Sequence, residues 1–196
     1  MQVAGHVLQI GRQQLVLDLS RSEGSDYLFD KLDALLRESV TAYLKWDMNR
    51  DLAQAADMRG QMAYAKQIPN LYALLQRLRL AHQAVEIERC ASGGGRMDLG
   101  ILQHTPRFWT SDNNDAVARA AIQSGAARLF PLEVLGAHVG PAPAHTTGRS
   151  KSLALRCAVA LFGHMGAASS ARPRHRHWLT GLASTNPSAR CCTPAA

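Results

Sequence analysis

The stretch Tyr43-Leu44-Lys45-Trp46-Asp47 has the composition of a short β-strand and ends on an aspartate. Two later stretches have the same form, because residues 85–88 run into Cys90 and residues 107–110 run towards Asp112. Polar residues at the carboxyl ends of successive parallel strands are what a (β/α)8 barrel uses to build an active site. The pattern therefore predicts that Asp47, Cys90 and Asp112 gather at one end of a parallel sheet.

Helical patterns alternate with these strands, and the alternation indicates βα units. Leucines recur at helical spacing in residues 27–38, after a candidate cap at Ser22 or Ser25, and in residues 71–80, where Pro69 is expected to limit the start. Asp115 is expected to cap a third helix. The other expected elements are that helix at 115–123, strands at 14–19 and 127–131, a loop at 136–148 and a helix from about residue 152.

We predict an α/β fold: a (β/α)8 TIM barrel present only as an incomplete carboxy-terminal part of about four to five βα units. A complete barrel takes about 250 residues, so about three strands are expected to be missing at the amino end. A doubly wound sheet is the alternative, and it would carry a G-x-G-x-x-G fingerprint. Gly93-Gly94-Gly95 follows a strand without that spacing, so the barrel is favoured.

The composition changes abruptly after Gly166, which divides the chain into residues 1–166, a partial catalytic barrel, and residues 167–196, a basic tail. The tail has no acidic residue and few large apolar ones. Such a composition cannot offset the entropy of ordering. The tail is therefore expected to be disordered, or to be an out-of-frame translation.

Several classes of protein are disfavoured by composition. The net charge of +7 falls to +3 for residues 1–166 once the four arginines of the tail are subtracted, and no basic stripe remains for nucleic acid. No run of eighteen apolar residues predicts a membrane span, and no signal peptide is recognised. The four cysteines lack metal-ligand spacing, so a cytoplasmic protein is expected.

Six ordered motifs carry a family resemblance. They are KWDMNR at 45–50, ERCASGGGRMDLG at 88–100, WTSDNNDA at 109–116, GAHV at 136–139, HTTGR at 145–149 and FGHMG at 162–166. Together with residues 12–20 they resemble the α-galactosidases of glycoside hydrolase family 36, and the resemblance covers roughly residues 8–166.

The resemblance implies retaining hydrolysis of terminal α-linked galactose from raffinose- or melibiose-type oligosaccharides, through a covalent galactosyl-enzyme and without metal or cofactor. It implies that Asp47 is the nucleophile and Asp112 the general acid/base. The intact parent could be a homo-oligomer. The residues that match sugar-binding positions are Arg12, Lys45, Trp46, Met48, Asn49, Cys90 and Gly93.

Simpler interpretations stay open beside these. An aspartate at a strand end is commonly a helix cap, and a lone buried cysteine is commonly a core residue. Arg96 and Asp98 are interpreted as a structural pair, and the widely spaced histidines as loop residues rather than metal ligands. The alternative function is an inactive gene fragment, because the family's earlier barrel strands and its flanking β-domains are not in the sequence.

Overall fold

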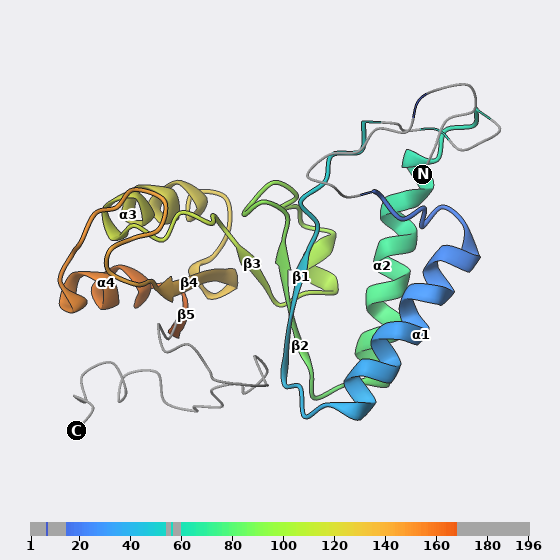
Figure 1. Ribbon diagram of the computed structural model, residues 1–196, viewed down its shortest axis with the longest axis horizontal. Coiled ribbons are helices and arrows are strands. Elements are labelled where there is room, and N and C mark those ends of the chain that lie inside the picture. The colour runs from blue at the N-terminus through green and yellow to red at the C-terminus, as the bar shows by residue number, and fades with distance from the viewer. Residues whose placement is uncertain (1–6, 8–14, 54–55, 57–59, 168–196) are drawn as a thin grey trace.

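The computed structural model describes residue 7, residues 15–53, residue 56 and residues 60–167. In these residues five strands form one sheet, accompanied by four α-helices and two short 3-10 helices (Figure 1). The strands are β1 (Tyr43–Asp47), β2 (Glu86–Cys90), β3 (Arg107–Trp109), β4 (Leu135–Val139) and β5 (His164–Ala167). The helices are α1 (Ser22–Glu38), α2 (Tyr64–Ala81), α3 (Ala116–Ala126) and α4 (Leu153–Ala160), with η1 (Ile101–Gln103) and η2 (Leu132–Val134).

All five strands are parallel, and their order in the sheet is their order in the sequence. A doubly wound sheet reverses its strand order at a switch point, whereas consecutive βα units of a barrel do not. The register pairs Asp47 with Cys90, so the carboxyl ends of β1 and β2 lie side by side. The structure thus confirms the α/β class and the incomplete barrel of parallel strands.

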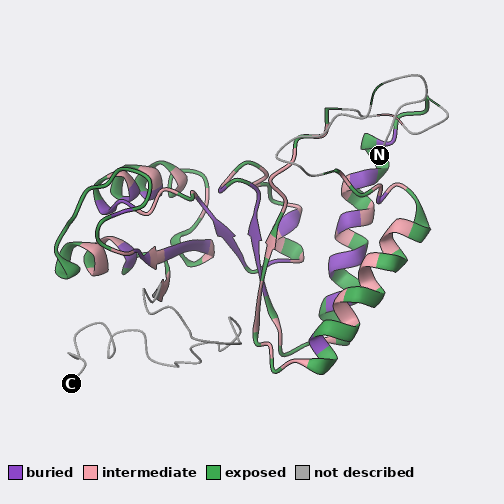
Figure 2. Ribbon diagram, in the orientation of Figure 1, coloured by how far each residue is buried: buried purple, intermediate pink, exposed green. Residues whose placement is uncertain are grey.

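One face of the sheet is apolar and packs against helices. Ile87, Phe108 and Leu135, from three neighbouring strands, belong to a single buried cluster. Helix α2 adds Leu74, Leu75 and Leu78 to this cluster, and Figure 2 shows its buried side turned towards the sheet. Helix α1 lies beside α2 and is more exposed (Figure 2).

Helix α2 begins earlier than the sequence predicted, at Tyr64, and Pro69 lies inside it. The extra turns are held by side-chain hydrogen bonds to the segment before α1. Gln67 accepts from the Leu19 amide at 2.8 Å and donates to the Leu17 carbonyl at 3.0 Å, and Asn70 donates to the Leu19 carbonyl at 2.6 Å. Tertiary contacts therefore outweigh the helix-ending tendency of proline.

The same hydrogen bonds explain why the expected strand at 14–19 is wrong for its described residues. The backbone groups of Leu17 and Leu19 bond to side chains of α2, so they are used outside a sheet ladder. Helix α1 also starts earlier than residue 27, directly after Arg21, and no side chain caps it. The proposed serine caps are therefore wrong.

The fourth strand was misplaced by the sequence pattern. Residues 127–131 form turns after α3, and the strand is β4, within the stretch expected to be a loop. Gly136 explains its unusual composition, because a Cβ there would lie 2.7 Å from Glu88 Oε2 and 2.8 Å from the Phe108 carbonyl oxygen. The helix from about residue 152 is confirmed as α4, whose cap Ser152 accepts from the Leu155 amide at 3.3 Å.

The tail boundary stays a prediction, because residues 168–196 lie outside the described part of the chain. Within the described part, no helix combines the length and the apolar character that a bilayer crossing requires.

Candidate functional site

The second face of the sheet is polar and carries the predicted site. Because side chains alternate along a strand, Lys45 and Asp47 of β1 share this face with Glu88 and Cys90 of β2. The Lys45 ammonium lies 3.9 Å from Glu88 Oε1 and 4.2 Å from the centre of the Trp109 ring. Lys45 of β1 thus contacts side chains from both β2 and β3.

Asp47 is exposed at the end of β1 and is held by its neighbour Asn49. The Asn49 side-chain nitrogen donates to Asp47 Oδ2 at 2.8 Å. The Asn49 oxygen accepts from the backbone nitrogen of Ser92 at 2.7 Å and from its hydroxyl at 3.1 Å. The carboxylate of Asp47 is therefore linked to the loop that follows β2.

Asp112 lies in the loop after β3 and is held by Trp109. The indole nitrogen of Trp109 donates to Asp112 Oδ1 at 2.8 Å. A tryptophan N–H can only donate, so Asp112 is the acceptor in this bond. Trp109 therefore contacts both Lys45 of β1 and the candidate acid/base.

Trp109 is itself fixed by three partners. Besides Lys45, the guanidinium of Arg119 lies 4.6 Å from its ring centre, and the His138 ring lies 4.4 Å away. Arg119 is 2% exposed and donates to the carbonyls of Ser111 at 2.9 Å and Gly136 at 2.8 Å. Cations over an indole face are attracted to its ring quadrupole, so the ring that holds Asp112 has little freedom to rotate.

Burial shapes the electrostatics of this face. Desolvation raises the pKa of Glu88, and the charges of Lys45, Arg107 and Arg119 oppose the shift. Desolvation also lowers the pKa of His138 to about 4, helped by Lys45 and Arg119, and lowers the pKa of Arg119 to about 10. His138 is therefore neutral at physiological pH, and positive charge comes from the lysine and arginines.

Cys90 is buried beside the two charged residues of β1. Burial is the largest cause that raises the pKa of its thiol to about 11; a backbone hydrogen bond from Gly93 and the Lys45 charge act in the opposite direction, and Asp47 raises the pKa further. The thiol is therefore protonated at neutral pH and is a weak hydrogen-bond donor rather than a nucleophile.

The backbone conformation and close packing of the loop after β2 require a glycine at position 93. Its φ is +80°, and a Cβ there would lie 2.7 Å from the Ser111 Cα. The glycine lets the loop after β2 press against the chain that leads to Asp112.

The remaining predicted residues have different placements. Trp46 lies on the opposite face of β1 and packs against the apolar core, away from the face of Asp47. The Met48 carbonyl accepts from Arg96 at 2.9 Å. Arg12 lies outside the described residues.

Asp115 caps α3, as predicted, by accepting from the Val117 amide at 3.0 Å. The interpretation of Arg96 and Asp98 as a pair is wrong, because they bond elsewhere. Arg96 binds backbone carbonyls, and Asp98 accepts from the Tyr72 hydroxyl and the Ile101 amide, each at 2.8 Å. No cluster of potential metal ligands occurs in the described part of the chain.

Sequence reasoning assigned no role to Trp109, Arg119 or Glu88. It interpreted His138 as a loop residue, and this is wrong because His138 lies in β4. Arg119 had a detectable signal, since it is the one charged residue in the alanine-rich stretch 116–126.

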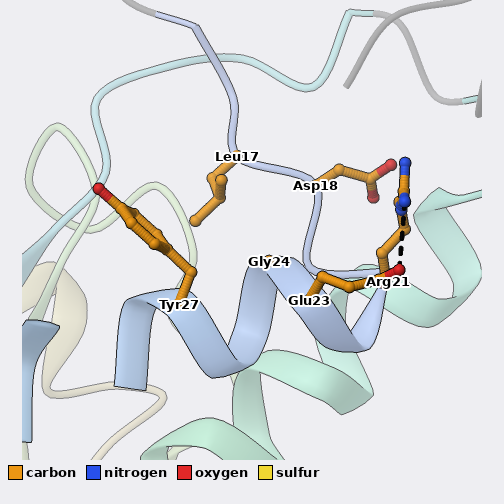
Figure 3. A pocket seen from close by; sticks show the side chains of 6 residues that line it. All are labelled: Leu17, Asp18, Arg21, Glu23, Gly24 and Tyr27. Carbon is orange, nitrogen blue, oxygen red and sulfur yellow. Dashed lines mark hydrogen bonds and ion pairs between the residues drawn. The ribbon is translucent and has the colours of Figure 1, made fainter. Parts of the chain in front are cut away.

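A hollow of about 300 Å³ lies elsewhere, at the amino end of α1, and none of the predicted residues lines it (Figure 3). Its mouth carries the exposed ion pair between Arg21 and Glu23, at 3.2 Å. The candidate site at the strand ends is therefore separate from this hollow.

The chain is similar to known proteins over most of its length. The family model described as Melibiase matches residues 1–173. The Escherichia coli protein named Alpha-galactosidase is 47% identical over 166 residues, which is 85% of this chain and 23% of that protein. The chain therefore spans less than a quarter of the length of this relative.

Solved structures give the same result. The galactosidase domain of the alpha-galactosidase-sucrose kinase AgaSK superposes with a TM-score of 0.78 at 37% identity, over 85% of this chain and 23% of that one. A variant of the GH36 alpha-galactosidase AgaA from Geobacillus stearothermophilus, in complex with raffinose, gives a TM-score of 0.76 at 36% identity, over 83% and 23%.

Proposed function

Because this chain belongs to the Melibiase family, the α-galactosidases of glycoside hydrolase family 36, we propose that it carries the catalytic pair of a retaining α-galactosidase. The substrate class is terminal α-linked galactose of raffinose- or melibiose-type oligosaccharides. The raffinose complex of the related AgaA variant supports this choice of substrate.

In the proposed reaction the Asp47 carboxylate attacks the anomeric carbon while Asp112 protonates the departing glycosidic oxygen. This step forms a covalent galactosyl-enzyme. Asp112, now a carboxylate, removes a proton from water, and the water oxygen displaces Asp47 from the same carbon with net retention. The hydrogen bonds from Asn49 to Asp47 and from Trp109 to Asp112 support these roles, because each orients one carboxylate.

The sugar-binding roles follow from the polar face. Lys45 would donate to galactose hydroxyls, and the Cys90 thiol and the Gly93 backbone would border the ring. Their common side of the sheet supports this assignment. Met48, Asn49 and Arg12 belong to the same proposed set, and Trp46 would act by fixing the strand from its opposite face.

Two experiments test this function. The first measures hydrolysis of p-nitrophenyl α-D-galactoside by the 196-residue chain, with Asp47→Asn as the control. The second replaces the matched segment of the E. coli relative with residues of this chain, and we call this protein the chimera. Turnover by the chimera that is lost in Asp47→Asn and in Asp112→Asn would support the proposed pair, and turnover that survives either change would refute it.

An inactive remnant is the second candidate, and the short span relative to the E. coli protein favours it for the isolated chain. We propose that the isolated chain has little or no turnover, because it spans only 23% of that relative and a tenfold loss in rate costs only about 1.4 kcal/mol. An active chimera together with an inactive chain would identify this outcome. Full activity of the chain alone would contradict it.

A further inference from the structure

The loop after β2 holds the segment after β1 at two neighbouring carbonyl groups. The Arg96 guanidinium donates to the Met48 carbonyl at 2.9 Å and to the Arg50 carbonyl at 2.8 Å. These carbonyls flank Asn49, the residue that donates to Asp47. A planar guanidinium presents its donors in a rigid fork, so the two bonds fix the backbone on both sides of Asn49.

Ser92 fixes the side chain of Asn49 in the same way. The backbone nitrogen of Ser92 can only donate, so the group that faces it must be the Asn49 oxygen. The Asn49 nitrogen must then face Asp47, which accepts. The orientation of this amide, and with it the hydrogen bond to the proposed nucleophile, is decided by Ser92.

The backbone of Ser92 indicates that the contact has a cost. Ser92 has φ +50°, in the left-handed region that a serine rarely adopts. Strain of this kind persists where the surrounding structure holds it in place, commonly at functional sites. In this conformation Ser92 donates two hydrogen bonds to Asn49.

We propose that Arg96 and Ser92 are positioning residues that orient the Asp47 carboxylate through Asn49. The proposal rests on the proposed function for the role of Asp47, but the orientation itself does not. Removing the Arg96 fork frees the backbone around Asn49, so its amide turns away from Asp47 and the carboxylate loses its fixed direction of attack.

The test observes the Asn49 side-chain amide directly, in nitrogen–proton correlation spectra of the 196-residue chain. Its signal is identified by its absence in Asn49→Asp. In Arg96→Lys, which keeps the charge and loses the fork, we expect the exchange of this amide with solvent to quicken about tenfold. Arg77→Lys is the matched control, because Arg77 lies on α2 and pairs at 2.6 Å with Asp26 of α1 rather than with the segment after β1. It should leave the Asn49 signal unchanged.

Two substitutions of Ser92 give a further test. Ser92→Ala removes the hydroxyl donor and keeps the strained backbone, whereas Ser92→Gly removes the hydroxyl and relieves the strain. Both should quicken the exchange of the Asn49 amide, and Asp47→Asn should shift its signal by removing the charged acceptor. An Asn49 signal that is unaffected by Arg96→Lys would overturn the proposal.

Turnover by the chimera then separates positioning from mere support of the fold. Arg96→Lys should lower kcat about tenfold to a hundredfold and change KM less than about threefold. An exposed Asn49 amide with unchanged kcat would also overturn the proposal. A chimera without any turnover would count against the proposed function, and the amide measurement would still decide the orientation.

Discussion

The indole nitrogen of Trp109 lies 2.8 Å from Oδ1 of Asp112, and the same ring lies 4.2 Å from the Lys45 ammonium. A single side chain therefore connects the strand of the proposed nucleophile with the proposed acid/base. Arg119 and His138 also pack on this ring, so several contacts hold the side chain that orients Asp112.

Trp109→Phe keeps an aromatic ring at this position and removes the indole N–H that donates to Asp112. A hydrogen bond to a charged group contributes about 1.5–3 kcal/mol, so we expect kcat of the chimera to fall about tenfold to a hundredfold with little change in KM. The control is Tyr72→Phe, which removes a hydrogen bond of 2.8 Å to the carboxylate of Asp98. Equal loss of kcat in both variants would show that the Trp109 bond has no special role.

Gly93→Ala should destabilise the chain by about 2 kcal/mol or more, because alanine is strained at φ +80° and its Cβ would lie 2.7 Å from the Ser111 Cα. Gly125→Ala, at an exposed position of α3 with no atom within 4 Å of the added Cβ, should be neutral or stabilising by up to about 1 kcal/mol. Urea unfolding measures both. A Gly93→Ala chain as stable as the parent would contradict the packing described for this loop.

His138 should make stability depend on pH. Its pKa is lowered to about 4 in the folded chain from an ordinary value of 6.5, so the unfolded chain binds more protons between these values. The contribution of His138 to the free energy of unfolding is therefore fully present above pH 6.5. It falls as the pH drops towards 4, by on the order of 2–3 kcal/mol. Burial lowers the pKa of His164 and of His104 in the same direction.

The contribution of His138 is obtained by difference. Urea midpoints of the parent and of His138→Gln are compared at pH 7.5 and pH 5, and the variant should lose less stability on acidification. The raised pKa of Glu88 acts with the opposite sign, because the folded chain then binds the extra proton. An identical pH dependence in parent and variant would show that His138 is not buried in neutral form.

Cys90 should resist alkylation. With a pKa of about 11 and an exposed fraction of 1%, its thiolate is scarce and poorly accessible at pH 8. We expect iodoacetamide to modify it at least about a hundredfold more slowly in the folded chain than in urea, measured by peptide mass spectrometry. Asp47→Asn should quicken the reaction of the folded chain, since Asp47 raises this pKa. An unchanged alkylation rate in Asp47→Asn would show that Asp47 does not influence the Cys90 thiol.

The elements that were predicted correctly from the sequence are those that depend on local patterns. The strand that ends at Asp47, the strand that ends at Cys90 and the cap at Asp115 are all confirmed. Each has a signal within a few residues, such as alternation or a capping side chain before a helix.

What the sequence pattern missed depends on distant partners. The segment before α1 has the composition of a strand, but Gln67 and Asn70 of α2 take its backbone groups. Gly136 and the residues around it look like a loop, because the space that a side chain would fill is taken by Glu88 from another strand. Arg119 supports the site from a helix and joins no sequence motif of its own.

The strand order has a consequence for how the site is assembled during synthesis. Because each of β2 to β5 pairs with the strand made just before it, the edge that it pairs with has already been synthesised when it leaves the ribosome. The 65 residues from Asp47 to Asp112 take about 3–13 s to synthesise at about 5–20 residues per second, whereas loop closure takes microseconds or less. The proposed nucleophile Asp47 and its Asn49–Ser92 support are thus made before the half of the sheet that carries Asp112.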